Sequence, residues 1–439
     1  MMKFLSTLAA TSLSLNSALT NEQATSILLE EVKSYSSDLG VGQLCKSYTC
    51  CNVTSTESCS LNNMPKDQTT LVLPGGNTRC IFSTSTPFAF QVVPGSSDKV
   101  LLYFQGGGAC WDEASTKAGF CTTDSSPQSL VGIFDRNEPL NKYKDYTIVH
   151  VSYCSGDLFG GDVVRDYTDS AGVPVIQKGY ENGLSAVNWI QQQQASGALS
   201  STLSDLVVMG CSAGSIGAQI WSDNSLNMIK WQKAAVIPDS YAGVFPDGSQ
   251  GPLIYGFGMC SVGKDFLSEA NYQKCIEQTL TLQDINLQFI PQHSDVPFSF
   301  IQSKTDIVQQ SFYTAVGLSM GLPALETPAE FYDKVNTIFE AYNTNPNFLT
   351  YLVSGDQHCF TPMSLYYTAD AVSNKDDGDN TNQQMMYDWT NKFPLAESET
   401  EVTVCEGTVQ SSKKGLYGAN STTYCASELF PKQYTEDYN

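Results

Sequence analysis

Short runs of consecutive apolar residues recur along the chain from residue 99 onward. Because these runs are continuous rather than alternating, they are typical of parallel strands that are covered on both faces. Helical patterns separate them, so the sequence predicts an α/β fold with a mostly parallel sheet flanked by helices. The expected strands are 99–105, 146–153, 205–210, 234–238, 297–302 and 348–355.

Two of the helical patterns have recognisable ends. Residues 184–190 place apolar side chains on one face, and Gly197 is expected to end that helix. Thr327 and Pro328, followed by Glu330, are typical of a helix start, with a capping hydroxyl, a proline in the first turn and an acid three residues after the cap.

The chain is predicted to form one large α/β domain with additions at both ends. Residues 71–400 hold the expected strands, whereas 21–70 form an N-terminal elaboration that begins with a helix over 21–35. Residues 401–439 form a cysteine-containing extension. Residues 241–296 contain many Gly, Pro and Tyr and no convincing strand, so we interpret them as a lid insertion over the sheet.

Residues 1–20 predict a signal peptide and therefore secretion. Lys3 precedes an apolar stretch that ends in small residues and is too short to span a membrane. No later segment approaches about 18 consecutive apolar residues, so no membrane anchor is expected. In a secreted chain, Asn52 and Asn420 are N-glycosylation acceptors, because each begins an Asn-x-Ser/Thr sequence.

Cysteine usage supports the same compartment. The chain has 14 cysteines and 3 histidines. An even cysteine number suits disulfides in an oxidising environment. No group of Cys and His has the spacing of a zinc site, so no metal is expected. Close spacing favours local disulfides that join Cys110 to Cys121, Cys260 to Cys275 and Cys405 to Cys425.

The formal net charge of −22 also narrows the choice of partners. A surface of this charge repels phosphate backbones, so a nucleic-acid partner is disfavoured. Solubility in an acidic or salty exterior accounts for the charge without any specific partner.

A serine lies in the strongest local motif. The strand expected at 205–210 runs into Gly210-Cys211-Ser212-Ala213-Gly214 and then into a helix, which is the G-x-S-x-G nucleophile elbow. The tight turn exposes the Ser212 hydroxyl, and the small glycines allow close packing around it. The helix N-terminus directs backbone amides toward a developing oxyanion.

A serine nucleophile needs a base, and the chain offers three histidines. The elbow topology places the base after Ser212, which removes His150, expected to be a satisfied histidine of the core. His293 has the pattern of an exposed loop residue. His358 follows the last expected strand, where a loop at the carboxyl edge of the sheet would carry the base. We therefore predict His358.

The acid that orients the base should lie between Ser212 and His358, after a strand. Asp306 follows the strand expected at 297–302 and suits this role. Asp239, at the end of 234–238, is the main alternative. Asp356 is close to His358 in sequence, but an acid on the same loop rarely points correctly.

Three glycines directly after the first expected strand complete the constellation. The sequence QGGGACW (105–111) stands at the position of the HGGG-type loop of esterases, where glycines let the backbone approach a substrate oxygen. We predict that the amides of Gly107, Gly108 and Ala213 form an oxyanion hole.

These motifs resemble the pectin acetylesterase and Notum family of extracellular α/β-hydrolase carboxylesterases. The resemblance spans about residues 100–360. It is carried by GGGAC (106–110) with Cys121, YCSGD (153–157) with GGD (160–162), GCSAG (210–214), DSYAG (239–243), DIVQ (306–309) and HC (358–359).

The resemblance implies an α/β-hydrolase fold with lid insertions and disulfides, and a Ser212, Asp306 and His358 triad, which favours Asp306 over Asp239. It also implies removal of an O-acyl group from a glycan or protein without a cofactor, most simply an O-acetyl group from a polysaccharide such as pectin in a cell wall. We expect the enzyme to be a monomer.

Two departures from the family pattern adjoin the acyl site. Ala109 stands where plant enzymes have Trp, and Gln105 stands where an acid is common. A negatively charged protein also repels a polyuronate at neutral pH, though less so in salt.

The alternatives are a Notum-like lipid O-deacylase, a serine peptidase and a non-catalytic glycan-binding protein with this fold. A lipid deacylase needs a deep apolar pocket, for which the lid region offers Tyr255, Phe257, Met259 and Phe266.

Overall fold

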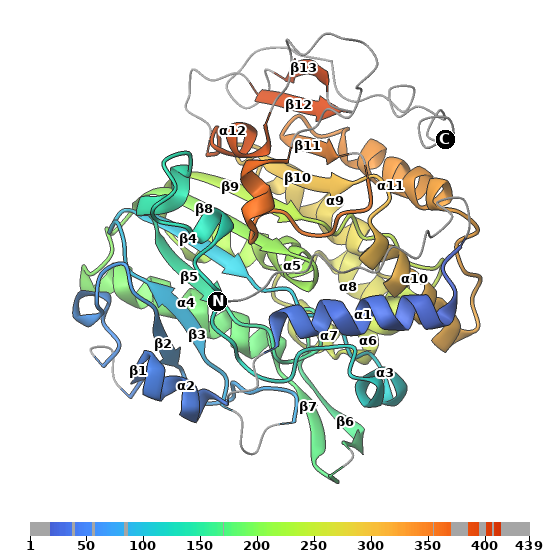
Figure 1. Cartoon of the computed structure of the whole chain (residues 1–439), viewed down its shortest axis with the longest axis horizontal. Helices are drawn as coiled ribbons and strands as arrows, with labels where there is room; N and C mark the ends of the chain where they lie inside the picture. Colours follow the sequence, from blue (N-terminus) through green and yellow to red (C-terminus); the bar gives the residue numbers. More distant parts are fainter. Residues whose placement is uncertain are drawn as a thin grey trace.

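The computed structural model describes residues 18–36, 40–54, 58–82, 87–169, 171–353, 355–369 and 385–394, and the backbone of 401–405 and 408–413. Within these ranges, strands from both ends of the chain join one long sheet (Figure 1). Its order is β1 (Thr49–Asn52), β2 (Thr70–Leu73), β3 (Phe90–Val93), β5 (Thr147–Val151), β4 (Lys99–Phe104), β8 (Leu203–Cys211), β9 (Trp231–Asp239), β10 (Phe298–Ser303), β11 (Phe348–Val353), β12 (Glu401–Cys405) and β13 (Thr408–Lys413).

The centre of this sheet confirms the expected strands and the α/β fold class. Each of the six apolar runs forms a strand, and all six pair in parallel in the order β5-β4-β8-β9-β10-β11. Both faces are covered, since successive residues of β8 enter two different cores: Leu206 and Val208 on one face, and Val207 and Met209 on the other. Continuous hydrophobicity follows from this double burial.

The outer strands were not expected from the sequence. β3 pairs antiparallel with β2 and β5, and β13 pairs antiparallel with β12. Most of these strands have only four or five residues, too few for a periodicity signal. A separate hairpin consists of β6 (Val163–Thr168) and β7 (Pro174–Gln177), and half-buried and exposed residues alternate along β6.

Both helices with predicted ends are present. α4 (Gly179–Ser196) ends at Gly197, which adopts the left-handed conformation with φ 77°. α11 (Pro328–Tyr342) starts after Thr327, whose hydroxyl accepts a hydrogen bond from the Glu330 amide. Together with α5 (Ala213–Met228), these helices contribute to the larger of the two cores.

Except for α3, the remaining helices come before β1 or after β9. Residues 241–296 form four short helices before β10, with no strand among these described residues. They are α6 (Gln250–Gly256), α7 (Met259–Gly263), α8 (Glu269–Ile276) and α9 (Leu282–Gln292). The others are α1 (Asn21–Tyr35), α2 (Val41–Ser47), α3 (Glu113–Ala118), α10 (Ile307–Met320) and α12 (Met386–Thr390). None of the helices in the described part of the chain is long and apolar enough to cross a membrane.

Disulfides join several of these segments. The Cys110–Cys121 and Cys260–Cys275 pairs agree with the expected local bridges. The expected Cys405–Cys425 pair lies outside the described side chains, as do Asn420 and most of the predicted signal peptide. Four further pairs were not foreseen: Cys45–Cys50, Cys51–Cys59, Cys80–Cys154 and Cys211–Cys359.

The helix start at Thr327 gives a first prediction. Thr327→Ala should lower the free energy of unfolding by about 1 kcal/mol, because the Glu330 amide loses its hydrogen-bond acceptor. Urea denaturation measures the change. Thr337→Ala is the control, since the exposed Thr337 hydroxyl bonds only a carbonyl within α11, and it should cost no stability. Equal losses in the two variants would contradict the capping role.

Candidate active site

Ser212 occupies a strained turn between β8 and α5. Its backbone has φ 59° and ψ −126°, a conformation that a residue with a side chain rarely adopts. The two glycines of the motif allow this turn to form against β4. A Cβ on Gly210 would lie 2.1 Å from the Gly214 carbonyl oxygen, and a Cβ on Gly214 would lie 1.9 Å from the Phe104 carbonyl oxygen. The G-x-S-x-G spacing is therefore required sterically.

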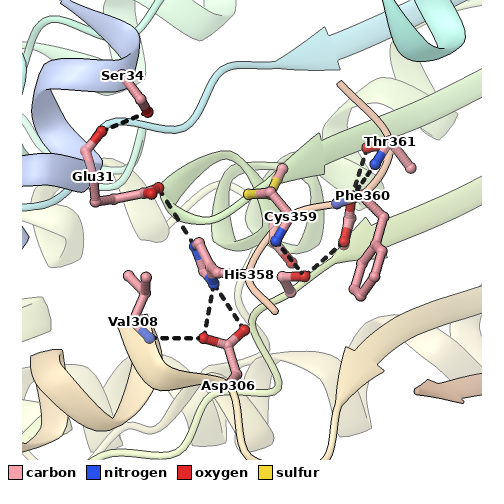
Figure 2. Close-up of a disulfide and its surroundings, with 12 residues drawn as sticks. Glu31, Ser34, Asp306, Val308, His358, Cys359, Phe360 and Thr361 are labelled. Atoms are coloured by element: carbon pink, nitrogen blue, oxygen red, sulfur yellow. Dashed lines mark hydrogen bonds and ion pairs between the residues drawn. A yellow bond between two sulfur atoms is a disulfide. The ribbon is translucent and has the colours of Figure 1, made fainter. Parts of the chain in front are cut away.

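His358 and Asp306 meet at the carboxyl edge of the sheet, on the loops after β11 and β10 (Figure 2). The His358 Nδ1 lies 2.7 Å from Asp306 Oδ2 and 2.9 Å from Oδ1. Asp306 is held as the N-cap of α10, where its Oδ1 accepts hydrogen bonds from the amides of Val308 and Gln309. The Gln309 side chain donates to Oδ2 over 2.9 Å. These donors hold the carboxylate in the orientation that faces the imidazole.

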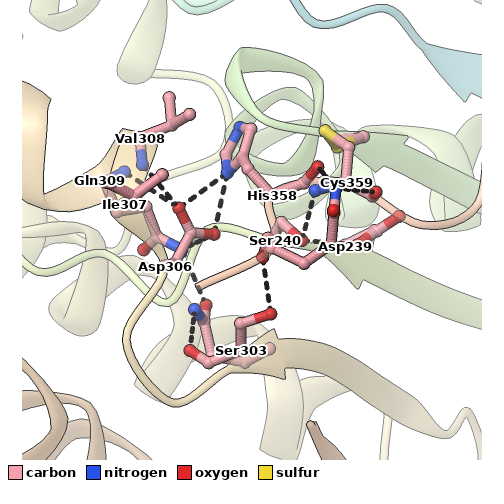
Figure 3. A network of polar contacts seen from close by, with 12 residues as sticks. Asp239, Ser240, Ser303, Asp306, Ile307, Val308, Gln309, His358 and Cys359 are labelled. Atoms are coloured by element: carbon pink, nitrogen blue, oxygen red, sulfur yellow. Dashed lines mark hydrogen bonds and ion pairs between the residues drawn. A yellow bond between two sulfur atoms is a disulfide. The ribbon is translucent and has the colours of Figure 1, made fainter. Parts of the chain in front are cut away.

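Asp239, the alternative acid, does not pair with the imidazole, whereas Asp306 does (Figure 3). It contacts the backbone beyond the histidine instead. Its Oδ2 accepts hydrogen bonds from the amides of Phe360 and Thr361 at 2.9 and 2.7 Å and from the Thr361 hydroxyl at 2.7 Å. Its Oδ1 accepts from Ser240, whose hydroxyl also accepts from the Cys359 amide. Asp239 thus anchors the loop that carries His358.

A disulfide links the same loop to the nucleophile turn. Cys211 and Cys359, neighbours of Ser212 and His358, are bonded across 148 residues of sequence. Both cysteines are fully buried. The covalent bond between them holds the two loops together. Sequence reasoning missed this pair, although each cysteine adjoins a motif residue and that adjacency was the available signal.

The glycine loop after β4 lies against the segment that ends at Cys121. Gly107 and Gly108 have φ values of 142° and 76°, and a Cβ on Gly108 would lie 2.0 Å from the Phe120 carbonyl oxygen. The neighbouring Ala109 amide is used in a bond to that carbonyl. Among the described residues, no hydrogen bond is formed by the amides of Gly107, Gly108 or Ala213.

The sequence comparison assigns a family to this arrangement. Residues 76–409, more than half of the chain, match the model of the pectinacetylesterase family. The chain belongs to this family. The matched segment contains the nucleophile turn, both loops and the glycine loop. It begins after α1, α2 and β2.

Two solved structures of the Wnt deacylase Notum from Drosophila are also similar. One crystal form has a TM-score of 0.49 and 15% identity, and the other has 0.48 and 14%. Each comparison covers 67% of this chain and 86% of that chain. No curated protein matches the chain.

Negative charges around His358 raise the pKa of its imidazole in this pectinacetylesterase-family protein. Burial by itself lowers the pKa, but the negative charges of Asp306, Glu31 and Asp239 outweigh it and raise the pKa to about 9. The Glu31 Oε1 lies 3.5 Å from His358 Nε2, on the side of the ring opposite Asp306 (Figure 2). Glu31 comes from α1, and no sequence pattern indicated it.

Apolar side chains enclose a small cavity beside Ser212. Its volume is about 20 Å³, and its walls come from the glycine loop, α5, α6 and α10. A second cavity of about 30 Å³ shares part of this wall and extends toward α7 and α9. The shared residues are Leu158, Ile216, Phe245, Leu253 and Phe257.

Only some of the residues that the sequence suggested for acyl contacts line the two cavities. Phe257, Met259 and Ala109 line the cavities, whereas Tyr255 is 47% exposed and Phe266 belongs to a separate core. Gln105 is buried and its side-chain oxygen accepts a hydrogen bond from the Tyr153 amide, so it has a structural contact.

Two expectations about the other histidines are wrong. His293 is not exposed but lies at the end of α9, with Nε2 2.8 Å from Asp223 Oδ1. His150 is buried as expected, but neither ring nitrogen has a hydrogen-bond partner among the described residues. Burial lowers the pKa of His150 to about 3, so the ring is neutral and packs as an aromatic group against Tyr103.

One set of potential metal-ligating atoms occurs among the described residues, at Cys211, His358 and Cys359. Both sulfurs of this set belong to the disulfide, so they do not offer thiolate ligands.

The contacts of Asp239 give a second prediction. Asp239→Ala should lower the free energy of unfolding by about 2–4 kcal/mol, because two buried amides and two hydroxyls lose a charged partner. Hydrogen exchange should also become faster at the Phe360 and Thr361 amides. Asp356→Ala, on the same loop but exposed, is the control and should change neither quantity. Unchanged exchange in Asp239→Ala would show that this carboxylate does not anchor the loop.

Proposed function

We propose that this pectinacetylesterase-family protein is a secreted serine carboxylesterase with Ser212 as nucleophile, His358 as base and Asp306 as the orienting acid. The contact that carries the proposal is the pairing of His358 Nδ1 with both oxygens of Asp306 at 2.7 and 2.9 Å. It leaves Nε2 as the nitrogen available to a serine proton. The strained turn that presents Ser212 supports the assignment of the nucleophile.

In the proposed reaction, His358 Nε2 takes the proton of Ser212 as the hydroxyl attacks the acyl carbonyl carbon. The amides of Gly107, Gly108 and Ala213 stabilise the tetrahedral oxyanion. The C–O bond to the alcohol then breaks, and His358 gives the proton to the leaving oxygen. Water hydrolyses the acyl-enzyme by the same route and releases the carboxylic acid.

We further propose an O-acetyl group on a polysaccharide such as pectin as the substrate. The small apolar cavity beside Ser212, of about 20 Å³, supports a short acyl group over a long one. Secretion to a cell wall or another exterior is supported by the N-terminal pattern, the disulfides and an exposed Asn52. The charge of −22 favours action on a polyuronate at low pH or in salt.

Removal of a longer acyl chain is the second candidate. The specific observation in its favour is the second apolar cavity, which shares five wall residues with the first and continues beneath the lid helices. Side-chain movements at the shared wall would join the two spaces into one deeper pocket.

Ester hydrolysis tests the nucleophile. Ser212→Ala should reduce the rate on p-nitrophenyl acetate by about 10³-fold or more, because no acyl-enzyme forms without the hydroxyl. Ser261→Ala, which removes an exposed hydroxyl from the lid region, should keep the full rate. Equal rates in wild type and Ser212→Ala, with no fluorophosphonate labelling of Ser212 even when α1 is displaced, would refute the esterase assignment.

A series of acyl chains separates the two candidate substrates. If the cavity beside Ser212 alone receives the acyl group, kcat/KM should fall from acetyl to octanoyl p-nitrophenyl esters. Release of acetate from acetylated pectin should accompany this order. A higher kcat/KM for the octanoyl ester would overturn the acetyl assignment in favour of the longer chain. Leu253→Trp, which fills the shared wall, should then lower the octanoyl rate selectively.

A further inference from the structure

Helix α1 lies across the candidate active site, alongside α10 (Figure 1). Leu28 packs into the apolar cluster that contains Trp111 and Phe312, both of which line the cavity at Ser212. Tyr35, at the end of the helix, places its hydroxyl 3.2 Å from Cys359 Sγ. The covered residues are shielded from solvent, with Ser212 1% and His358 5% exposed. A substrate that is part of a polymer has no access to Ser212 in this arrangement.

The glycine loop is in contact with the same helix. A Cβ placed on Gly108 would lie 2.9 Å from Val32 Cγ2, and one on Gly106 would lie 2.6 Å from the Tyr35 ring. α1 therefore packs directly against the glycine loop as well as over the nucleophile.

Glu31 brings a carboxylate to the reacting atoms. Its Oε1 lies 3.5 Å from His358 Nε2, and its side chain is only 10% exposed. The Ser212 hydroxyl faces this carboxylate without forming a hydrogen bond of normal geometry. In the proposed reaction, His358 Nε2 receives the serine proton while Ser212 attacks the ester. The Glu31 carboxylate lies at this nitrogen and therefore occupies space that the ester group would need.

The position of Glu31 costs energy that other contacts must offset. Burial raises the pKa of Glu31, while the positive charge of His358 lowers it and Asp306 raises it again. A charged Glu31 is costly here without a positive partner, so it favours the protonated form of His358. A protonated His358 cannot act as a general base.

We propose that α1 is an intramolecular inhibitor, in which Glu31 holds His358 in a charge pair and blocks the ester site until the helix moves away. This inference rests on the proposed function. α1 suits the role because its own sequence stabilises it as a helix: Thr20 and Gln23 form a capping box and Lys33 lies in the last turn.

Release of α1 should depend on pH. Docking of α1 buries Glu31 and raises the pKa of its carboxyl, so the covered state holds this proton more tightly than a state in which Glu31 is in solvent. Rising pH therefore favours the open state. The groups that face this pair are Asp306, Asp239 and Tyr35.

The test measures how fast a small fluorophosphonate labels Ser212 in the full-length protein. Glu31→Gln should react at least about tenfold faster than wild type, because the neutral amide forms no charge pair with His358. Its rate should also rise less steeply with pH. Glu30→Gln, an exposed neighbour on the same helix, should match wild type. An unchanged or slower rate in Glu31→Gln would overturn the proposal and would assign Glu31 a supporting role in the triad.

A second pair of variants displaces the helix without changing Glu31. Leu28→Asp puts a charge into the buried face of α1, and Leu29→Asp puts the same charge at a position that is 43% exposed. Leu28→Asp should accelerate labelling and amide hydrogen exchange in α1, whereas Leu29→Asp should change neither. Faster exchange with an unchanged rate of labelling would show that α1 is no barrier and would also overturn the proposal.

Failure of the proposed function has a separate signature. If the proposed function is wrong, Ser212 should not be labelled in any variant, including Leu28→Asp with rapid amide exchange in α1. With no serine chemistry to inhibit, the inhibitor proposal would fall as well.

Discussion

The backbone turn at Ser212 is the constraint on which the site depends. A positive φ at a residue with a side chain is unfavourable, so the surrounding structure has to enforce it. β8 and β9 flank the turn on the sheet side, and the Ser212 amide donates to the Asp239 carbonyl at 3.2 Å. The same Asp239 uses its carboxylate to hold the loop after His358. Asp239 therefore connects the turn at Ser212 to the loop of His358 through both its backbone and its side chain.

The two aspartates near His358, Asp306 and Asp239, have different contacts. Asp306 is the N-cap of a helix, where amides support a charge that points outward to the imidazole. Asp239 is enclosed by donors from the loop itself and has no free direction toward the ring. The sequence left the choice open because both residues follow a buried strand, and only the helix start after Asp306 distinguishes them.

Local signals account for what could be predicted. The central strands, α4 and α11 followed from continuous hydrophobicity and capping residues, which depend on neighbours in sequence. His293 and the Cys211–Cys359 bridge depend on partners 70 and 148 residues away, and no pattern in one chain identifies such partners. The helix at 21–35 was predicted, but its docking site was not. The apolar face of an amphipathic helix shows which side is buried but not which part of the protein packs against it.

Glu31 shows why that docking matters for the chemistry. The proposed triad requires access for water and substrate, yet its three side chains are nearly inaccessible in this structure. Covering them with apolar residues alone would leave His358 Nε2 without a partner, and a carboxylate resolves that problem by charge pairing. The carboxyl group also has the shape and charge of the acid that ester hydrolysis releases. The residue that makes α1 compatible with the closed site is thus the residue best placed to keep the site inactive.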